Sequence, residues 1–119
     1  MSPSTRPLER VVEAHVRVAL HNEGVLVWKH RIDVCPTCGE KPKRGQGLGL
    51  GASDLVIVVP PLGRFLAIEM KRPGYSPSDV RKEQREWLAV VRKFGGVSGV
   101  ASSSEEALAL LKEARDVSA

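Results

Sequence analysis

A predicted β-hairpin in the middle of the chain is the feature that most constrains the fold. The run Leu55–Val59 contains no polar side chain, which is typical of a strand buried on both faces. Residues 60–63 (Pro-Pro-Leu-Gly) have the composition of a turn, and Phe65–Lys71 reads as the partner strand. Because the connection is short, the pair is expected to be antiparallel. Any fold for this chain has to be built around that hairpin.

The remaining predicted elements place the hairpin in a mixed sheet covered by helices. Apolar residues at helical spacing predict a helix over residues 8–23, with its stripe formed by Leu8, Val12, Val16, Ala19 and Leu20. Further elements are expected as a strand over 25–29, a helix from Ser76 to Phe94, a strand over 97–101 and a helix capped by Ser103 and Glu106. The order is α-β-β-β-α-β-α, which indicates an α/β (α+β) fold with a mixed sheet.

Length and composition exclude several classes of protein. A chain of 119 residues forms one core, so we expect a single domain over residues 1–119. With 42% apolar and 27% charged residues, disorder along the whole chain is excluded. No apolar run is long enough for a membrane span, and residues 1–7 lack the apolar region of a secretory signal. These observations predict a cytoplasmic protein that does not interact with membranes.

The positive charge is concentrated in the middle of the sequence. The formal net charge is +4, with a net of zero over residues 1–40, +6 over 41–93 and −2 over 94–119. A basic segment of this kind favours a polyanionic partner such as nucleic acid. The alternative is a solvated basic face without a specific partner.

Residues 33–53 interrupt the pattern of helices and strands. The segment is rich in glycine and basic residues, and a loop this long is typically functional or mobile. Its Cys35 and Cys38 form a Cys-x-x-Cys pair, which in a cytosolic chain is more often a metal or redox site than a disulfide. Zinc usually takes four ligands, so His30, Asp33 or thiolates of a second copy would have to complete a zinc site. Free thiols and a local disulfide are the alternatives.

Two carboxylates are expected to meet at one end of the hairpin. Side chains alternate along a strand, so Glu69 and Lys71 share one face of the second strand. Asp54 begins the first strand, where its carboxylate can lie close to Glu69. Two carboxylates held together repel unless a cation lies between them, and oxygen ligands select Mg²⁺ or Mn²⁺. The alternative is a capping aspartate beside an ordinary surface pair of opposite charge.

Two polar residues on the predicted helices are weaker candidates for the same site. Gln84 lies on the apolar stripe of the helix 76–94, where a polar side chain needs a partner. It can point into the site or bond to the backbone as a buried glutamine. Glu13 lies at the edge of the first helix's stripe, where Glu9 competes with it and a solvated flank is the alternative. The stripe of the second helix comprises Val80, Trp87, Leu88, Val91 and Phe94.

Taken together and in this order, these residues resemble the VRR-NUC (virus-type replication-repair nuclease) domain, a branch of the PD-(D/E)XK restriction-endonuclease-like fold. The resemblance extends from about Glu13 to Leu111. Residues 51–55 match the family's Gly-x-Pro-Asp-Leu, with Ser53 in place of proline, and residues 68–74 match its E-x-K strand. The change at Ser53 removes stiffness but no ligand, so we expect activity to be retained. Further matches are Glu13, the basic residue Lys29, Gln84 and the cap at residues 102–106, whereas the Cys35–Cys38 segment is an insertion.

The resemblance implies a role for each residue of the site. Two carboxylates and one backbone carbonyl would bind Mg²⁺ or Mn²⁺, and a lysine would position or activate the attacking water. A glutamine and a helical acid would complete the catalytic set, the acid as a further candidate metal ligand. The carboxylates are those of Asp54 and Glu69, and the backbone carbonyl is that of Met70. The lysine is Lys71, the glutamine is Gln84 and the helical acid is Glu13.

The resemblance also implies a nucleic-acid substrate. Short stand-alone members are similar to structure-specific DNA nucleases, some of which cut four-way (Holliday) junctions as homodimers, since two symmetric nicks need two active sites. We therefore expect a metal-dependent endodeoxyribonuclease acting on branched DNA in a bacterial or phage-infected cell. Flap or duplex nucleases of the repair or restriction type, and a non-catalytic zinc-stabilised nucleic-acid-binding module, are the alternatives. The residues expected to hold phosphates are Lys29, Lys41, Lys43, Arg44, Arg72, Arg81, Lys82 and Arg85.

Overall fold

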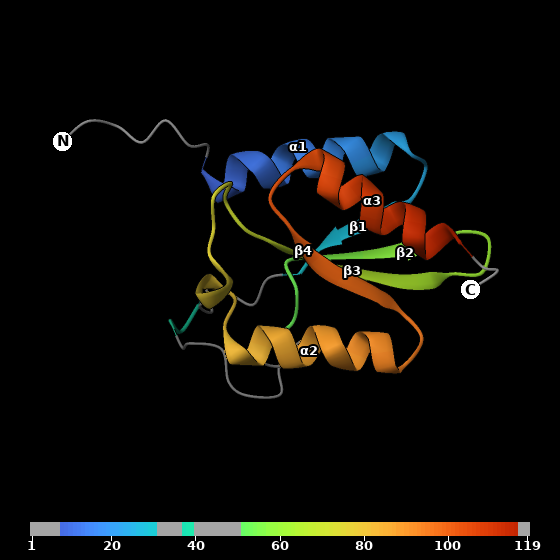
Figure 1. Ribbon diagram of the computed structural model, residues 1–119. Helices are drawn as coiled ribbons and strands as arrows, with labels where there is room; N and C mark the ends of the chain where they lie inside the picture. Colours follow the sequence, from blue (N-terminus) through green and yellow to red (C-terminus); the bar gives the residue numbers. More distant parts are fainter. Residues whose placement is uncertain (1–7, 31–36, 40–50, 117–119) are drawn as a thin grey trace.

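The computed structural model describes residues 8–30, 37–39 and 51–116 (Figure 1). Within them, the predicted order of helices and strands is confirmed. None of the helices in these described ranges has the length and apolarity to cross a membrane. The elements are α1 (Glu9–Asn22), β1 (Leu26–Lys29), β2 (Leu55–Val59), β3 (Arg64–Met70), a 3₁₀ turn η1 (Pro77–Asp79), α2 (Lys82–Lys93), β4 (Val97–Ala101) and α3 (Ser104–Arg115).

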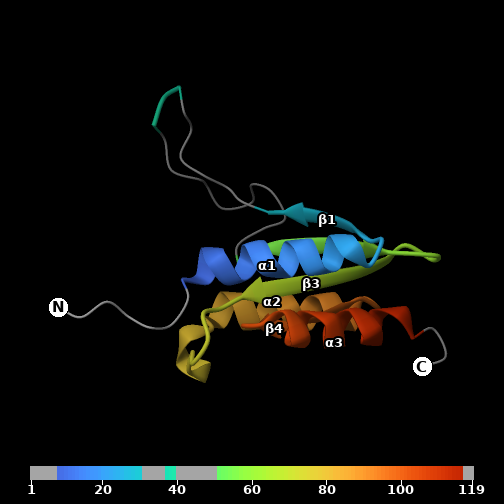
Figure 2. The same ribbon diagram turned by 90° about the horizontal axis from the view of Figure 1, so that it is seen from above.

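The four strands form one mixed sheet in the order β1-β2-β3-β4. β2 pairs antiparallel with both β1 and β3, and the short turn at residues 60–63 requires this for the β2–β3 pair. β4 runs parallel to β3, because the chain crosses back through α2 before entering it. Figure 2 shows β1 at one border of the sheet and β4 toward the side of α3.

Helices cover the sheet on both faces, but unequally. α1 and α3 lie on one face and α2 on the other (Figure 1). The face under α1 and α3 carries the apolar core, including the fully buried Leu66, Ile68 and Met70 of β3. Among the described residues, α2 contacts β3 and β4 but neither β1 nor β2. Within the described ranges, no helix therefore covers the α2 face of β1 and β2.

The helix expected from Ser76 to Phe94 is wrong in one respect, because the chain forms two separate elements there. The side chain of Asp79 accepts a hydrogen bond from the backbone N of Ser76 (2.8 Å), which closes the short turn η1. Val80 then adopts extended backbone angles and is buried, so the α-helix begins anew at Lys82. A local cap and the burial of one valine thus override the continuous helical periodicity.

Two residues predicted on buried helical stripes are exposed. Phe94 is the C-cap of α2 and is 82% exposed, at the rim of an apolar groove shared with Phe65 and Trp87. Leu8 is the N-cap of α1 and is 47% exposed. Both lie at helix termini, where the helix no longer packs on the sheet and helical periodicity no longer predicts which side chains are buried.

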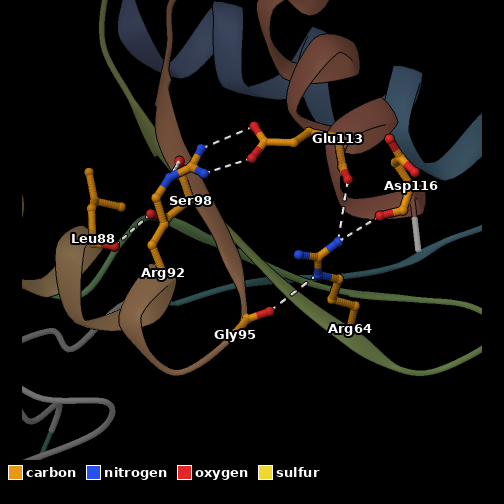
Figure 3. A network of polar contacts seen from close by, with 7 residues as sticks. All are labelled: Arg64, Leu88, Arg92, Gly95, Ser98, Glu113 and Asp116. Carbon is orange, nitrogen blue, oxygen red and sulfur yellow. Dashed lines mark hydrogen bonds and ion pairs between the residues drawn. The ribbon is translucent and has the colours of Figure 1, made fainter. Parts of the chain in front are cut away.

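A polar network fastens α2 to β4 and α3 at the far end of α2 (Figure 3). Arg92 donates to the carbonyl oxygen of Ser98 (3.0 Å) and makes a two-pronged ion pair with Glu113. The buried hydroxyl of Ser98 donates to the carbonyl oxygen of Leu88 (2.6 Å). Arg64 donates to carbonyl oxygens at the C-terminal end of α3 (Figure 3). Surface ion pairs contribute little stability individually, so the main effect of the network is to fix the position of α2.

The core assignment predicts a contrast between two leucines, one in the turn at residues 60–63 and one in the strand that follows it. Leu66→Ala removes a fully buried side chain and is expected to lower the free energy of unfolding by about 2–5 kcal/mol. Leu62→Ala, at a side chain that is 75% exposed, is the matched control and should cost less than about 0.5 kcal/mol. Urea denaturation measures both, and equal losses would contradict the assigned core.

Candidate active site

The register of the hairpin places Asp54 opposite Glu69. Leu55 pairs with Ile68, so the residue before Leu55 faces the residue after Ile68. Residues that are directly opposed in an antiparallel pair have Cβ atoms about 5 Å apart. The carboxylate of Asp54 accepts a hydrogen bond from the backbone N of Met70 (2.9 Å), which holds it at the end of β3. The structure thus brings the two predicted carboxylates together.

The segment before Asp54 is fixed by two small residues. Gly51 has a positive φ of 81°, and a Cβ at this position would overlap the backbone carbonyl of Glu83 in α2. Ser53 is fully buried, and its hydroxyl donates to the carbonyl oxygen of Leu55 (2.9 Å), spanning Asp54. That hydrogen bond restrains the backbone where the family pattern has a proline. The segment that leads into Asp54 therefore begins against the first turn of α2.

Glu69 is the most constrained side chain of the site. It is 3% exposed and lies on the α2 face of β3. Gln84 donates from Nε2 to its Oε1 (2.7 Å), and the Lys71 Nζ lies 3.9 Å from the same oxygen. The Gln84 amide is itself oriented, because its Oε1 accepts from the backbone N of Arg81 (2.9 Å). Gln84 therefore bonds both to the backbone and to Glu69. The two alternatives weighed from the sequence, a buried glutamine bonded to the backbone and a glutamine that points into the site, are both correct.

The environment of Glu69 opposes a negative charge. Burial, the charge of Asp54 and a hydrogen bond shared with the Asp54 carboxylate together raise the pKa of its carboxyl to about 8, although Lys71 acts in the opposite direction. The second oxygen, Oε2, is buried and has no hydrogen-bond partner among the described residues. An unpartnered buried carboxylate oxygen is costly. A cation between Asp54 and Glu69 would satisfy that oxygen and remove the repulsion between the carboxylates.

These residues fit a divalent cation with oxygen ligands. Two carboxylates and the unpartnered Oε2 of Glu69 provide hard donors of the kind that Mg²⁺ and Mn²⁺ prefer. In the described part of the chain, no three His, Cys, Asp or Glu side chains gather as a metal-binding cluster. The cation would therefore need ligands besides side-chain carboxylates, such as a backbone carbonyl and water.

Glu13 has Lys29 as its direct partner. It is buried, and its carboxylate forms an ion pair with the ammonium group of Lys29. Lys29 lies on the face of β1 that packs toward α1, whereas Glu69 and Gln84 lie on the α2 face. No described hydrogen bond or ion pair joins this pair to Asp54 or Glu69, but the charge of Glu13 contributes to the raised pKa of Glu9, as the charge of Asp54 does. With its charge neutralised by Glu13, Lys29 is also less suited to binding phosphate than its sequence position implied.

Glu9, in the first turn of α1, interacts electrostatically with the site. Partial burial and the charge of Asp54 raise its pKa, and Glu9 in turn contributes to the raised pKa of Glu69. The sequence offered one signal for this residue, since Glu9 is an acid in the first turn of a helix and lies one turn before Glu13.

The predicted phosphate-binding residues are distributed around the site. Arg72 follows Lys71 and is half-buried, and its Nε has no hydrogen-bond partner among the described residues. Arg81, Lys82 and Arg85 are exposed on the first turns of α2, next to Gln84. Cys38 is exposed and is a free thiol. The predicted residues Cys35, Lys41, Lys43 and Arg44 lie outside the described residues.

A scan against protein-family models matches the VRR-NUC domain over residues 12–105. The chain belongs to the VRR-NUC domain family. The match includes Asp54, Glu69, Lys71 and Gln84, whereas Glu9 precedes it. This VRR-NUC domain thus has a nuclease-type function, with DNA as the substrate class. Searches of the curated proteins and of the solved structures return no significant match.

The close approach at Gly51 predicts a difference between two glycines. Gly51→Ala introduces both a strained left-handed backbone and an overlap with Glu83, whereas Gly24→Ala introduces only the strain, because no atom lies within 4 Å of its Cβ position. The strain alone costs about 1–2 kcal/mol. Gly51→Ala is expected to lower the free energy of unfolding by more than Gly24→Ala. Chemical denaturation tests this, and equal losses would show that the loop moves away from α2 without cost.

The raised pKa of Glu69 predicts a pH-dependent stability of the metal-free protein. The folded-state pKa of Glu69, about 8, exceeds the ordinary value of 4.5. The stabilising contribution of Glu69 to the free energy of unfolding is therefore fully present below pH 4.5 and is lost as the pH rises through 8. Glu69→Gln keeps a neutral side chain and should lose less stability over this range. Thermal unfolding in EDTA between pH 5 and pH 9 measures the difference, and parallel pH profiles for the two proteins would contradict the assigned pKa.

Proposed function

We propose that this VRR-NUC domain is a Mg²⁺- or Mn²⁺-dependent endonuclease that hydrolyses phosphodiester bonds in branched DNA. The observation that carries the proposal is the buried Glu69, which faces Asp54 and has one oxygen left without a partner. An arrangement with this electrostatic cost is typical of sites that act on a ligand.

The cation would be held by Asp54, Glu69 and the backbone carbonyl of Met70. A divalent cation there supplies Lewis acidity and neutralises charge on a phosphate. Asp54 is already oriented for this role by the hydrogen bond from the backbone N of Met70. The cation would also replace the proton that Glu69 holds at neutral pH in the metal-free protein.

Lys71 and Gln84 act on the same centre from two sides. Lys71 lies beyond the last residue of β3, where its ammonium can orient the attacking water and stabilise the charge that develops on the phosphate. Gln84 holds Oε1 of Glu69 in place and leaves Oε2 directed to the ligand. Arg81, Lys82 and Arg85 on the first turns of α2 would bind the phosphates that flank the cleaved bond.

A homodimer is proposed as the active form on four-way junctions. One VRR-NUC domain of this size contains one Asp54–Glu69 pair, and resolving a junction requires nicks in two strands. Two copies related by a twofold axis provide two equivalent sites. Branched DNA and the homodimer are the finer parts of this proposal, beyond the nuclease-type function that the family gives.

Cleavage by three proteins tests the proposal. The wild type, Asp54→Asn and Glu69→Gln are incubated with a labelled four-way junction, a flap and a plain duplex, in Mg²⁺, Mn²⁺ or EDTA. Paired symmetric nicks in the junction, dependent on the metal, are expected for the wild type, with a loss of at least 100-fold in both variants. DNA binding should persist in both variants. Asp79→Asn, at the exposed cap of η1, is the matched control and should cleave like the wild type.

Each result separates the candidates. Cleavage by either site variant at the wild-type rate would contradict the assigned metal ligands. Metal-dependent cleavage of the flap or duplex, with the junction intact, would retain the nuclease and reject junction resolution. Salt-sensitive binding without cleavage in every metal would favour a non-catalytic nucleic-acid-binding module.

A further inference from the structure

Trp28 lies on the same face of the sheet as the catalytic carboxylates. The residues Leu26, Val27, Trp28 and Lys29 of β1 alternate between exposed and half-buried positions, and Val27 packs against the core under α1. Trp28 and Leu26 therefore lie on the opposite face, which is the α2 face. Trp28 is paired with Val56 of β2, and Val56 is paired with Ala67 of β3.

The distance from Trp28 to the site follows from strand geometry. The row of the site contains His30, Asp54 and Glu69, and it lies two residues beyond the row of Trp28. With about 3.4 Å per residue along a strand and about 4.8 Å between strands, the Cα of Trp28 is about 8 Å from that of Asp54. The corresponding distance to Glu69 is about 12 Å.

This part of the sheet is apolar and is exposed along β1, whereas Val56, next to Trp28, is only 7% exposed. Trp28 is 50% exposed and Leu26 is 56% exposed, although both belong to a strand. Leu26 and Val58 line a shallow groove of about 320 Å³ at the turn end of the hairpin. Among the described residues, α2 does not contact β1 or β2, so α2 does not cover this surface. We call the surface formed by Leu26, Trp28 and Val58 the β1 platform.

We propose that the β1 platform binds an unpaired nucleobase of the DNA substrate, with Trp28 as the stacking residue. The inference rests on the proposed function, because it takes the phosphate at Asp54 and Glu69 as its reference point. The rise per nucleotide along one strand of duplex DNA is 3.4 Å. A base stacked on Trp28 would therefore lie within about three nucleotides of the bond that is cut.

Chemistry and position favour a nucleobase over a protein partner. The platform is continuous with the metal site on one face, and the cationic Lys71 lies beyond Glu69 on that face. An aromatic surface next to basic groups is the combination that binds single-stranded nucleic acid, because every base has a face that can stack. In a fully paired duplex the base faces are occupied by their neighbours. The platform therefore provides a way to prefer DNA with unpaired bases, such as the branch point of a junction or the start of a flap.

Binding measurements in EDTA test this without cleavage. Each protein is titrated with a plain duplex and with a duplex that carries a bulge of unpaired thymines and the same number of phosphates. Trp28→Ala is expected to weaken binding of the bulged DNA by about 5- to 100-fold, the range that one base–aromatic stack contributes, and to leave duplex binding unchanged. Trp28→Tyr retains a stacking ring and should restore most of the preference. If Trp28→Ala weakened both DNAs equally, or neither, the proposal would be wrong.

A fluorescence measurement reports on Trp28 directly. The chain has two tryptophans, so Trp87→Phe leaves Trp28 as the single tryptophan and keeps an aromatic ring beside Phe65. Its emission should be quenched by the bulged DNA and much less by the duplex. Equal quenching by the two DNAs would overturn the proposal.

Phe94→Ala is the matched control, since Phe94 is the most exposed aromatic ring among the large apolar residues that the structure describes. It lies ten residues beyond Gln84, which is about 15 Å along α2 and away from the site. This variant should bind both DNAs like the wild type. An equal loss of the bulge preference in Phe94→Ala would show a nonspecific effect and contradict the platform.

The outcomes also separate this inference from the proposed nuclease. If the wild type cuts no DNA in any metal, but binds bulged DNA more tightly than duplex and Trp28→Ala does not, the platform stands and the proposed nuclease does not. If the wild type cuts DNA and Trp28→Ala changes neither the preference nor the quenching, the platform falls alone. If sedimentation shows that Trp28→Ala dissociates a dimer without changing the bulge preference, the surface is a contact between copies and the proposal is overturned.

Discussion

The buried carboxyl group of Glu69 opposite Asp54 is the interaction on which the site depends. A chain that only had to fold would place an apolar residue at the end of β3, because a buried carboxylate without a full set of partners destabilises the folded state. Here the neighbouring groups do not remove this cost. Gln84 and Lys71 both face Oε1 of Glu69, whereas Oε2 has no described partner. The surrounding structure thus presents one unsatisfied oxygen in a fixed direction.

Several distant parts of the fold serve that arrangement. α2 carries Gln84, and its far end is anchored through Arg92 and the hydroxyl of Ser98 (Figure 3). At its near end, the backbone of Gly51 lies against α2 and leads directly into Asp54. The carboxylates are contributed by the hairpin, and the residue that orients Glu69 comes from α2, the crossover helix between β3 and β4. Packing of α2 on β3 and β4 is therefore a condition for the geometry of the site.

Much of this could be predicted from the sequence, because strand alternation and turn length are local rules. The apolar run of β2 and the short turn were sufficient to predict an antiparallel pair, and the pair then places Asp54 opposite Glu69. The break before Lys82 could not be predicted, since Asp79 competes with the helix for the backbone of Ser76. The position of Glu13 also depends on tertiary structure. Its partner Lys29 reaches α1 only because the alternation of side chains along β1 places Lys29 on the face that packs toward α1. Glu9 was named only as a competitor of Glu13 for a similar reason, because its interaction with Asp54 crosses from α1 to the hairpin.

The central claim is that Asp54 and Glu69 hold one cation between them, and anomalous scattering from crystals grown with Mn²⁺ tests it most directly. The account predicts an anomalous peak in contact with Asp54 and with Oε2 of Glu69, and no peak there in Glu69→Gln. A peak bound elsewhere in a protein that still cuts DNA would contradict the account. So would a wild-type protein that cuts DNA in Mn²⁺ with no peak at these carboxylates.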